Sequence, residues 1–250
     1  MELYGLIGYP LSHSFSAQYF SEKFFREGIH NTLYELFPIS TIEQFLPLIK
    51  EKKELKGLNV TTPYKESILP FLDFIDPIAK EIGAVNTVRI EKREKLILHG
   101  FNTDVFGFEE SIKSLLHPQH KKALILGTGG ASKAVGYVLK KMGIDYFFVS
   151  GKMQGTSSIF TYSDLDKEII SSHLLIINTS PVGMFPNLHE APDIPYQFIS
   201  KDHLLFDLVY NPAETLFMKK GIEKGAVVSN GLKMLYIQAE KSWEIWNCEK

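Results

Sequence analysis

Three glycines that directly follow a short apolar run are the strongest chemical signal in the sequence. Residues 124–126 have the composition of a strand buried on both faces, and Gly127, Gly129 and Gly130 come next. Apolar residues then recur every three to four positions up to Gly143, which is typical of a helix and its end. Strand, glycine turn and helix in this order bring backbone N–H groups and a helix dipole to one point. The stretch therefore predicts a site for the pyrophosphate of a dinucleotide, although glycine-rich loops also close ordinary turns.

The residues after the next expected strand bear on the choice of cofactor. A strand at 146–149 ends in Ser150, Gly151 and Lys152. NAD sites usually place an acid at this tip to bind the ribose 2′-hydroxyl, whereas NADP sites avoid the acid and supply a cation. Lys152 and the lack of an acid favour NADP. The last position of the G-x-G-x-x-G/A motif falls on Ser132, so we expect slightly looser packing of the helix on the strand.

Lys65 lies close to the end of an expected strand at 57–61. Pro63 is well placed for the first turn of a helix, which would keep Lys65 beside the strand tip. A lysine in the first turn of a helix opposes the helix dipole, and this indicates a role other than stability. The alternative is a solvated surface charge.

Asn86 and Asp104 flank an expected hairpin. Apolar residues alternate with polar ones from 88 to 98 around the charged turn at 91–94. Because the hairpin is antiparallel, the amide that leads into it and the carboxylate that leaves it should lie at the same end. Asp104 can equally cap the helix expected at 105–116.

Hydroxyl groups cluster before the first expected helix. Ser12, His13, Ser14 and Ser16 follow a strand at 3–8, and apolar residues at helical spacing continue to Gly28. A single serine here would be read as a helix cap. Three hydroxyls and an imidazole within five residues exceed what one cap needs, so the cluster is also a candidate polar binding site.

Strands and helices alternate along most of the chain. This rhythm predicts an α/β protein with mostly parallel sheets and with ligands at the carboxyl ends of the strands. A helix interrupted near Pro77 is expected at 71–82, and a final helix at 232–246 should pack against the first domain. Further strands are expected at 32–37, 174–178, 204–209 and 226–229.

Composition excludes several classes of function. The apolar fraction of 44% and the charged fraction of 22% are typical of a soluble globular protein, and the formal net charge of -2 gives no case for nucleic-acid binding. The lone cysteine, Cys248, allows no internal disulfide, and no apolar run is long enough for a membrane helix, so we expect a cytoplasmic protein. No metal-ligand spacing, G-x-S-x-G elbow or phosphoryl-transfer loop is present, which leaves nicotinamide redox chemistry without a metal.

Seven separated motifs resemble those of the shikimate dehydrogenase family, and together they extend from Gly8 to Gln238. The resemblance implies an N-terminal α/β substrate domain (residues 1–104 plus 233–250) and a Rossmann-type dinucleotide-binding domain (105–232). The motifs are residues 8–16 (GYPLSHSFS), 59–65 (NVTTPYK), 83–87 (GAVNT), 102–104 (NTD), the glycine loop, 178–184 (NTSPVGM) and 231–239.

The resemblance also implies a reaction, which is the NADP-dependent, reversible reduction of 3-dehydroshikimate to shikimate in aromatic amino-acid biosynthesis. The expected partner is this small-molecule substrate, bound by a monomer or a homodimer. Two alternatives stay open at this point. One is a quinate/shikimate dehydrogenase of broader specificity, and the other is a non-catalytic nucleotide-binding regulator built on the same scaffold.

Roles follow from the resemblance position by position. Lys65 and Asp104 would act at the reacting oxygen, with Lys65 either as the sole proton carrier or mainly as an electrostatic stabiliser. The substrate would be bound by Ser14, Ser16, Thr61, Asn86, Tyr210 and Gln238. The cofactor would be bound by Gly127, Thr128, Gly129, Gly130, Ala131, Ser150, Lys152, Thr179, Met184, Val209, Gly231 and Met234.

Two positions depart from the family pattern. Gly151 stands where the family commonly has an arginine that meets the adenine and the 2′-phosphate, so we expect a weaker preference for NADP unless Lys152 substitutes. Ala17 replaces a proline that is usual after the second serine, and we expect this change to have little effect.

Overall fold

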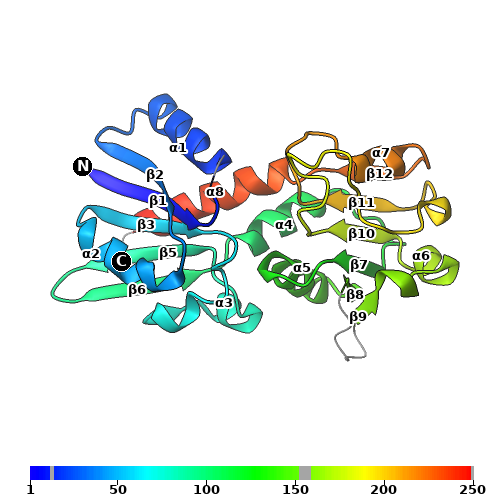
Figure 1. Cartoon of the computed structure of the whole chain (residues 1–250), viewed down its shortest axis with the longest axis horizontal. Coiled ribbons are helices and arrows are strands. Elements are labelled where there is room, and N and C mark those ends of the chain that lie inside the picture. The colour runs from blue at the N-terminus through cyan, green and yellow to red at the C-terminus, as the bar shows by residue number, and fades with distance from the viewer. Residues whose placement is uncertain (12–13, 152–158, 249–250) are drawn as a thin grey trace. The chain divides into compact units, whose positions relative to one another are not determined.

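The computed structural model describes residues 1–11, 14–151 and 159–248, and it divides into two compact units. The first unit comprises Met1–Thr103 and the C-terminal stretch from Ala239, and the second comprises Asp104–Gln238. The helix α8 (Leu232–Asn247) contributes its first half to the second unit and its second half to the first. Figure 1 labels the elements.

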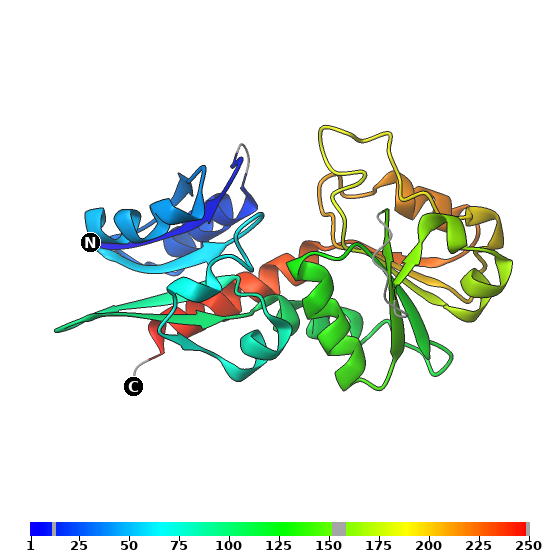
Figure 2. The same ribbon diagram turned by 60° about the horizontal axis from the view of Figure 1, so that its bottom comes forward.

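The first unit is built on a six-stranded mixed sheet, called sheet 1 here, with the order β2-β1-β3-β5-β6-β4. The strands β1 and β2 are parallel, as are β1 and β3, whereas β5 is antiparallel to both β3 and β6. The β5–β6 hairpin extends past its neighbours, as Figure 2 shows. The strands are β1 (Glu2–Gly8), β2 (Thr32–Pro38), β3 (Leu55–Val60), β4 (Phe74–Ile75), β5 (Thr87–Lys92) and β6 (Leu96–Phe101).

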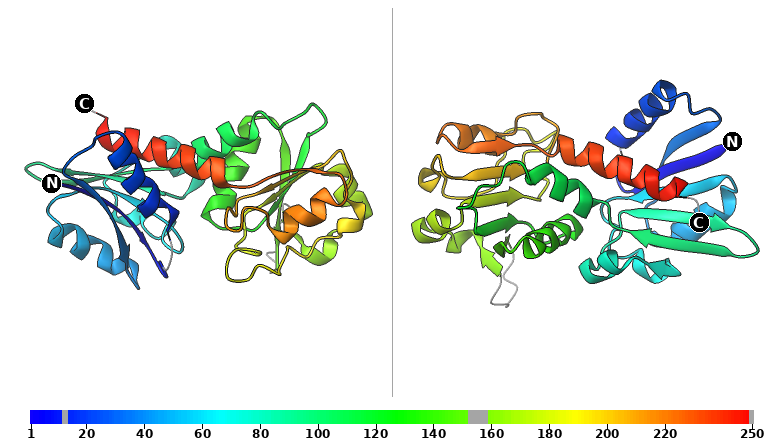
Figure 3. Two further views of the ribbon diagram at one scale, coloured as in Figure 1. Left: turned by 90° about the horizontal axis from the view of Figure 1, so that it is seen from above. Right: turned by 180° about the vertical axis from the view of Figure 1, so that it is seen from behind.

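Helices cover both faces of sheet 1. One face packs on α2 (Phe45–Glu51) and α3 (Pro77–Ile82) through an aliphatic core. The other face packs on α1 (Phe15–Arg26) and α8 through aromatic residues, with Tyr4 stacked on Trp246 at 4.9 Å between ring centroids. The right-hand view in Figure 3 shows α8 lying across the strands. This packing holds the second half of α8, with Ala239 and Trp246, against sheet 1.

The second unit has a six-stranded sheet, called sheet 2 here, in which every pairing is parallel. Its order is β12-β11-β10-β7-β8-β9. From β7 the strand order runs through β8 to β9 on one side, and from β10 through β11 to β12 on the other. The boundary between β7 and β10 is therefore the topological switch point, where doubly wound folds bind dinucleotides. The strands are β7 (Lys122–Leu126), β8 (Asp145–Ser150), β9 (Ile159–Thr161), β10 (Leu175–Asn178), β11 (Leu204–Asp207) and β12 (Val227–Ser229).

Both faces of sheet 2 are buried, which explains why its strands read as continuous apolar runs rather than alternating ones. One face packs on α6 (Lys167–Ser172) and α7 (Leu216–Ile222). On the other face, Phe108 of α4 (Asp104–Ile112) meets Phe206 edge to face at 5.4 Å, and Val135 and Val138 of α5 (Gly130–Lys141) are fully buried. The predicted two-domain α/β fold class is therefore confirmed.

Two predicted helices differ from the structure. The segment after Pro63 forms turns rather than a helix, with bonds such as Tyr64 N to Thr61 O (2.9 Å), and a short 3-10 helix follows at Leu69–Phe71. Only six residues lie between Pro63 and Pro70, too few for a helix free of proline interference. The expected helix at 71–82 is also wrong in its first half, because β4 pairs with β6 there and α3 begins only at Pro77, capped by Asp76.

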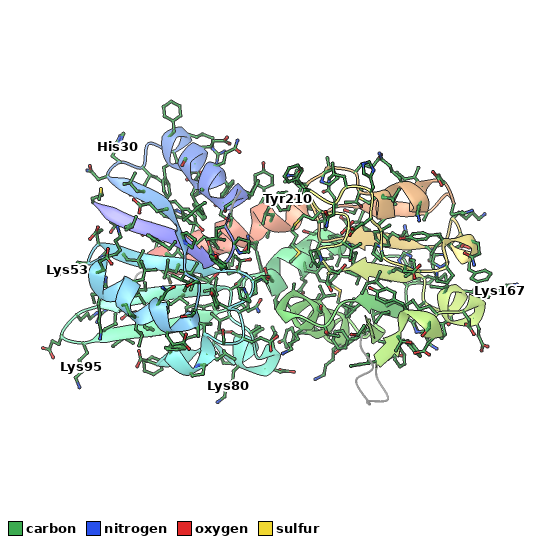
Figure 4. All side chains as sticks on the ribbon, viewed as in Figure 1. His30, Lys53, Lys80, Lys95, Lys167 and Tyr210 are labelled. Atoms are coloured by element: carbon green, nitrogen blue, oxygen red, sulfur yellow. The ribbon has the colours of Figure 1, made fainter. Side chains whose placement is uncertain are left out.

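Short 3-10 helices complete the chain at Ile42–Gln44, Tyr162–Asp164 and Tyr196–Phe198. Within the described ranges, no helix has the length and hydropathy needed to cross a membrane. Figure 4 shows Lys53, Lys80 and Lys95 at the periphery of the first unit, so these lysines are spread apart rather than gathered into one basic patch.

Candidate active site

One edge of sheet 1 collects the site residues predicted for the first unit. The strands β1, β3 and β6 end at this edge and β5 begins there, because Ile7 pairs with Val60 and Thr87 pairs with both Asn59 and Phe101. Ser14 and Ser16 follow β1, Thr61 and Lys65 follow β3, and Asn86 precedes β5. The sheet thus brings the substrate-side residues of this unit to one place, together with Lys65.

Backbone hydrogen bonds hold the Lys65 turn against its neighbours. The carbonyl oxygen of Lys65 accepts from Val85 N at 2.7 Å, and Asn86 O accepts from Val60 N at 2.8 Å. The buried Tyr64 donates its hydroxyl to Ile39 O at 2.6 Å. The side chain of Lys65 is half-buried. Position in the sheet and these bonds, not the helix expected after Pro63, therefore place Lys65 beside Asn86.

The amide oxygen of Asn86 is fixed by the strand that leaves the hairpin. It accepts from Thr103 N at 2.7 Å and from the hydroxyls of Thr103 and Thr87 at 3.2 Å each. Only 3% of Asn86 is exposed. With three donors aimed at it, the oxygen is engaged within the protein. Asp104 is the residue that follows Thr103 and it begins α4.

A buried polar network lies beneath these residues, and the sequence did not reveal it. Ser242 of α8 accepts from Asn59 Nδ2 at 2.9 Å and is 2.8 Å from the hydroxyl of Thr87. Asn59 Oδ1 accepts in turn from Tyr34 at 2.8 Å. Burial raises the pKa of Tyr34, an effect that its hydrogen bond with Ser16 opposes. The network links α1, sheet 1 and α8. Its only signal in the sequence is the position of Ser242 four residues after Gln238, which places both residues on the same face of the last helix.

The glycine loop of the second unit follows β7 at the switch point. Gly127 has φ +121°, a conformation open to glycine, and a Cβ there would lie 2.7 Å from Thr179 Oγ1. Thr179 Oγ1 donates to Leu126 O at 2.7 Å and lies 2.7 Å from Ser132 Oγ. Ser132 is 1% exposed. The expected loosening at Ser132 is therefore wrong, because its hydroxyl binds the neighbouring loop instead of separating helix and strand.

The start of α5 fits an anion. Gly129 precedes the helix with extended backbone. Among the described residues, no side chain caps the helix and no atom lies within 4 Å of a Cβ placed on Gly129. Open space in front of the first N–H groups of a twelve-residue helix suits a pyrophosphate. Thr128 lies in the loop before the helix, and Gly130 and Ala131 are the first two residues of the helix.

The other residues predicted for the second unit lie at the same carboxyl edge of sheet 2. Val149, Leu126, Asn178 and Asp207 are in register across β8, β7, β10 and β11. Ser150 ends β8. The residues that follow β10, β11 and β12 are Thr179, Met184, Val209, Tyr210 and Gly231, and Figure 4 labels Tyr210 on the loop after β11. Met234 and Gln238 lie on α8, and Lys152 lies outside the described residues.

Gly231 is required by a close approach of backbone. A Cβ at this position would collide with Leu208 O, and Gly231 N donates to Val209 O at 3.2 Å. Val209 and Met234 are buried, whereas Met184 is 42% exposed. The loop after β11 and the start of α8 are therefore packed together, and Met184 is one of the exposed apolar side chains of the loop after β10.

Sequence reasoning also missed a buried carboxylate at this edge. Asp207, which is 0% exposed, ends β11 and accepts hydrogen bonds at both of its oxygens. Burial raises its pKa to about 6, against the lowering effect of bonds from Thr215, Val209 and Asn178. The only sequence signal was its place in the strand tip at 207–212. Among the described residues no grouping of three or more His, Cys, Asp or Glu could hold a metal ion.

The fold and the site define a class, which is a two-unit α/β protein whose second sheet carries a dinucleotide-binding edge. Residues 6–88 match the family model described as the shikimate dehydrogenase substrate binding domain. Over 258 residues the chain is 39% identical to the shikimate dehydrogenase (NADP(+)) of Aquifex aeolicus, an alignment that covers 99% of this chain and 92% of that protein.

Solved structures agree. The shikimate dehydrogenase 1 of Peptoclostridium difficile is 39% identical with a TM-score of 0.84, covering 100% of this chain and 93% of that one. The Thermus thermophilus enzyme in complex with NADP(H) and shikimate is 30% identical with a TM-score of 0.85, covering 99% and 94%. The chain belongs to the shikimate dehydrogenase family, which confirms the resemblance seen in the motifs.

Proposed function

We propose that this protein catalyses the NADP-dependent, reversible reduction of 3-dehydroshikimate to shikimate. The observation that carries the proposal is the presence of two edges in one chain. Sheet 1 has a polar edge with Lys65 beside Asn86, and sheet 2 has a glycine loop at its switch point. The names of the relatives, which specify shikimate dehydrogenase and NADP(+), support the choice of substrate and cofactor.

The residues of sheet 2 fit NADP. The N–H groups at the start of α5 would hold the pyrophosphate, with Gly127, Thr128, Gly129, Gly130 and Ala131 forming the loop. Ser150 and Lys152 would serve the adenosine end. The nicotinamide end would be held by Thr179, Met184, Val209, Gly231 and Met234.

When bound, NADPH supplies the hydride that reduces the substrate carbonyl. Negative charge then develops on the carbonyl oxygen, and the ammonium of Lys65 would stabilise that charge and donate a proton to the same oxygen. Asp104 would orient Lys65 and the substrate hydroxyl. In the reverse direction Lys65 would take the proton back.

The remaining polar groups would orient a polyhydroxylated acid. We assign the carboxylate to the hydroxyls of Ser14 and Ser16, and the carboxylate or ring hydroxyls to Thr61, Asn86, Tyr210 and Gln238. Because the oxygen of Asn86 is occupied by Thr103 and Thr87, Asn86 would act as a donor. Specificity for hydroxyl groups follows, since a substrate that lacks one would leave a buried polar group unpaired.

We further propose that the protein acts in the cytoplasm as a monomer or a homodimer on a small-molecule substrate. The sequence has a single cysteine, Cys248, so no internal disulfide can form, and this fits a reducing compartment. The broader quinate/shikimate activity and the regulator without catalysis are not favoured, because the curated relatives are named as NADP-dependent shikimate dehydrogenases.

Steady-state absorbance at the nicotinamide band tests the proposal. Shikimate and quinate are each offered with NADP+ and with NAD+. We expect reduction of NADP+ that depends on shikimate and is slower with quinate. Equal kcat/KM for shikimate and quinate would favour the broader enzyme, and no turnover with either would favour the regulator.

A further inference from the structure

Asp207 is a buried carboxylate whose oxygens bind three separate segments. Its Oδ1 accepts from Asn178 Nδ2 at 2.9 Å and from Val209 N at 3.0 Å, and its Oδ2 accepts from Thr215 Oγ1 at 2.6 Å. Asn178 ends β10, Val209 begins the loop after β11, and Thr215 caps α7. A single side chain therefore joins three segments at the carboxyl edge of sheet 2.

Two of these partners, Asn178 and Val209, form further hydrogen bonds that fix neighbouring loops. The amide oxygen of Asn178 accepts from Ser180 N at 3.1 Å and from Ser180 Oγ at 2.6 Å, which fixes the start of the loop at 179–184. Val209 O accepts from Gly231 N at 3.2 Å, which ties the loop at 208–212 to the start of α8. These are the segments that carry Thr179, Met184, Val209, Gly231 and Met234.

The chemistry of the partners requires an acceptor at both oxygens. Two of the three donors share Oδ1, and the third donor, Thr215 Oγ1, itself accepts from Met218 N at 3.3 Å and so has its proton free for Oδ2. An amide in place of the carboxylate would set an NH2 group against one of these donors. Burying a carboxylate at 0% exposure costs desolvation free energy. The role of Asp207 is therefore to fix the geometry of its three partners more than to stabilise the fold.

We propose that Asp207 is a positioning residue for the nicotinamide half of the cofactor, holding the loops at 179–184 and 208–212 in their binding geometry. This inference rests on the proposed function. It assigns no contact with the cofactor to Asp207, which acts through Asn178 and Val209.

The test compares Asp207→Asn with a matched control at the other end of the same strand. His203 is 2% exposed, precedes β11, and bonds Ser200 N at 3.1 Å and Ile170 O at 3.1 Å. His203→Gln disturbs a buried hydrogen-bonded side chain on the same strand, but far along it from the loops in question. Thermal unfolding measures the stability loss of each variant.

Ligand binding supplies the decisive readout. NADPH is titrated by its fluorescence without substrate, and adenosine 2′,5′-bisphosphate, which contains only the adenosine half, is titrated by competition. For Asp207→Asn we expect an NADPH Kd raised by roughly tenfold, as for the loss of one or two net hydrogen bonds, with the affinity for the bisphosphate changed by less than about twofold. For His203→Gln we expect both affinities to stay within about twofold at a similar loss of thermal stability.

Two results would overturn the inference. One is an equal loss of affinity for both ligands in Asp207→Asn, and the other is an NADPH loss in His203→Gln as large as that in Asp207→Asn. If Asp207→Asn does not fold, Asn178→Ala is measured instead, because it removes the hydrogen bonds that join Asp207 to the loop at 179–184. This variant must show the same selective loss of NADPH affinity. A wild-type protein without shikimate-dependent turnover would instead contradict the proposed function, which separates the two failures.

Discussion

Gly127 and Gly129 are glycines for different physical reasons, and alanine substitutions should separate them. At Gly127, φ +121° is strained for any other residue, and a Cβ would lie 2.7 Å from Thr179 Oγ1. We estimate a strain of about 1–3 kcal/mol. Displacing Thr179 would also weaken its bonds to Leu126 O and Ser132, at about 1 kcal/mol each.

The sum predicts that Gly127→Ala loses about 3–5 kcal/mol of unfolding free energy. For a chain of 250 residues this corresponds to a Tm lower by roughly 5–12 °C. NADPH binding should weaken as well, because the loop that begins the pyrophosphate site shifts.

At Gly129 the backbone is extended, with φ -80° and ψ -175°, and a Cβ would meet no atom of the described part of the chain within 4 Å. Gly129→Ala should therefore leave the Tm within about 2 °C, since the conformation is open to alanine and the change in capping is small. The methyl group would nevertheless occupy space that the pyrophosphate approaches, so NADPH should bind about tenfold more weakly or worse.

Differential scanning fluorimetry and NADPH fluorescence titration at 25 °C give the two readouts, with circular dichroism as the check on folding. A Tm loss in Gly129→Ala as large as that in Gly127→Ala would refute the assignment of the two roles. Unchanged NADPH affinity in Gly129→Ala would refute the placement of the pyrophosphate.

Three further predictions concern catalysis, cofactor choice and pH. Lys65→Ala should lower kcat by about two to four orders of magnitude with a small change in KM in steady-state assays, because the lost interaction belongs to the transition state; a folded variant with wild-type turnover would remove Lys65 from the mechanism. NADPH should be preferred over NADH, but by less than at a site with an arginine in place of Gly151, and equal kcat/KM for the two would end the NADP assignment. Thermal stability should fall as the pH drops below about 6.5, because burial lowers the pKa of His120, His173 and His203 in the folded protein, and the unfolded chain then takes up protons that the folded chain excludes. Asp207, whose pKa burial raises to about 6, opposes this effect only in part. A Tm that is constant or rising from pH 7 to pH 6 would contradict the prediction.

The sequence predicted most of the parallel strands because burial on both faces leaves a direct signal. The runs at 124–126 and 174–178 contain little but aliphatic residues, and each ends in a polar or glycine tip. The site residues at these tips could be found for the same reason, since parallel strands of one sheet end at one edge. The glycine loop was found because its conformation restricts the residue type itself.

What the sequence missed depends on contacts between distant residues. The bonds from Asn59 and Thr87 to Ser242 join positions more than 150 residues apart, and no local pattern announces them. Asp207 resembles any polar strand tip until its three donors are seen. The segment after Pro63 forms a turn and not the predicted helix. Proline suits a first helical turn, but the nearby Pro70 limits the length of any helix that begins there.

The central claim is that Lys65 acts at the oxygen that is oxidised and reduced, and a crystal structure of the protein with shikimate and NADP+ tests it most directly. We predict that Lys65 Nζ lies within hydrogen-bond reach of the reacting hydroxyl, at about 2.6–3.2 Å. The carbon that bears this hydroxyl should face the nicotinamide held by the carboxyl edge of sheet 2. A bound shikimate whose reacting hydroxyl is out of reach of Lys65 would contradict the account.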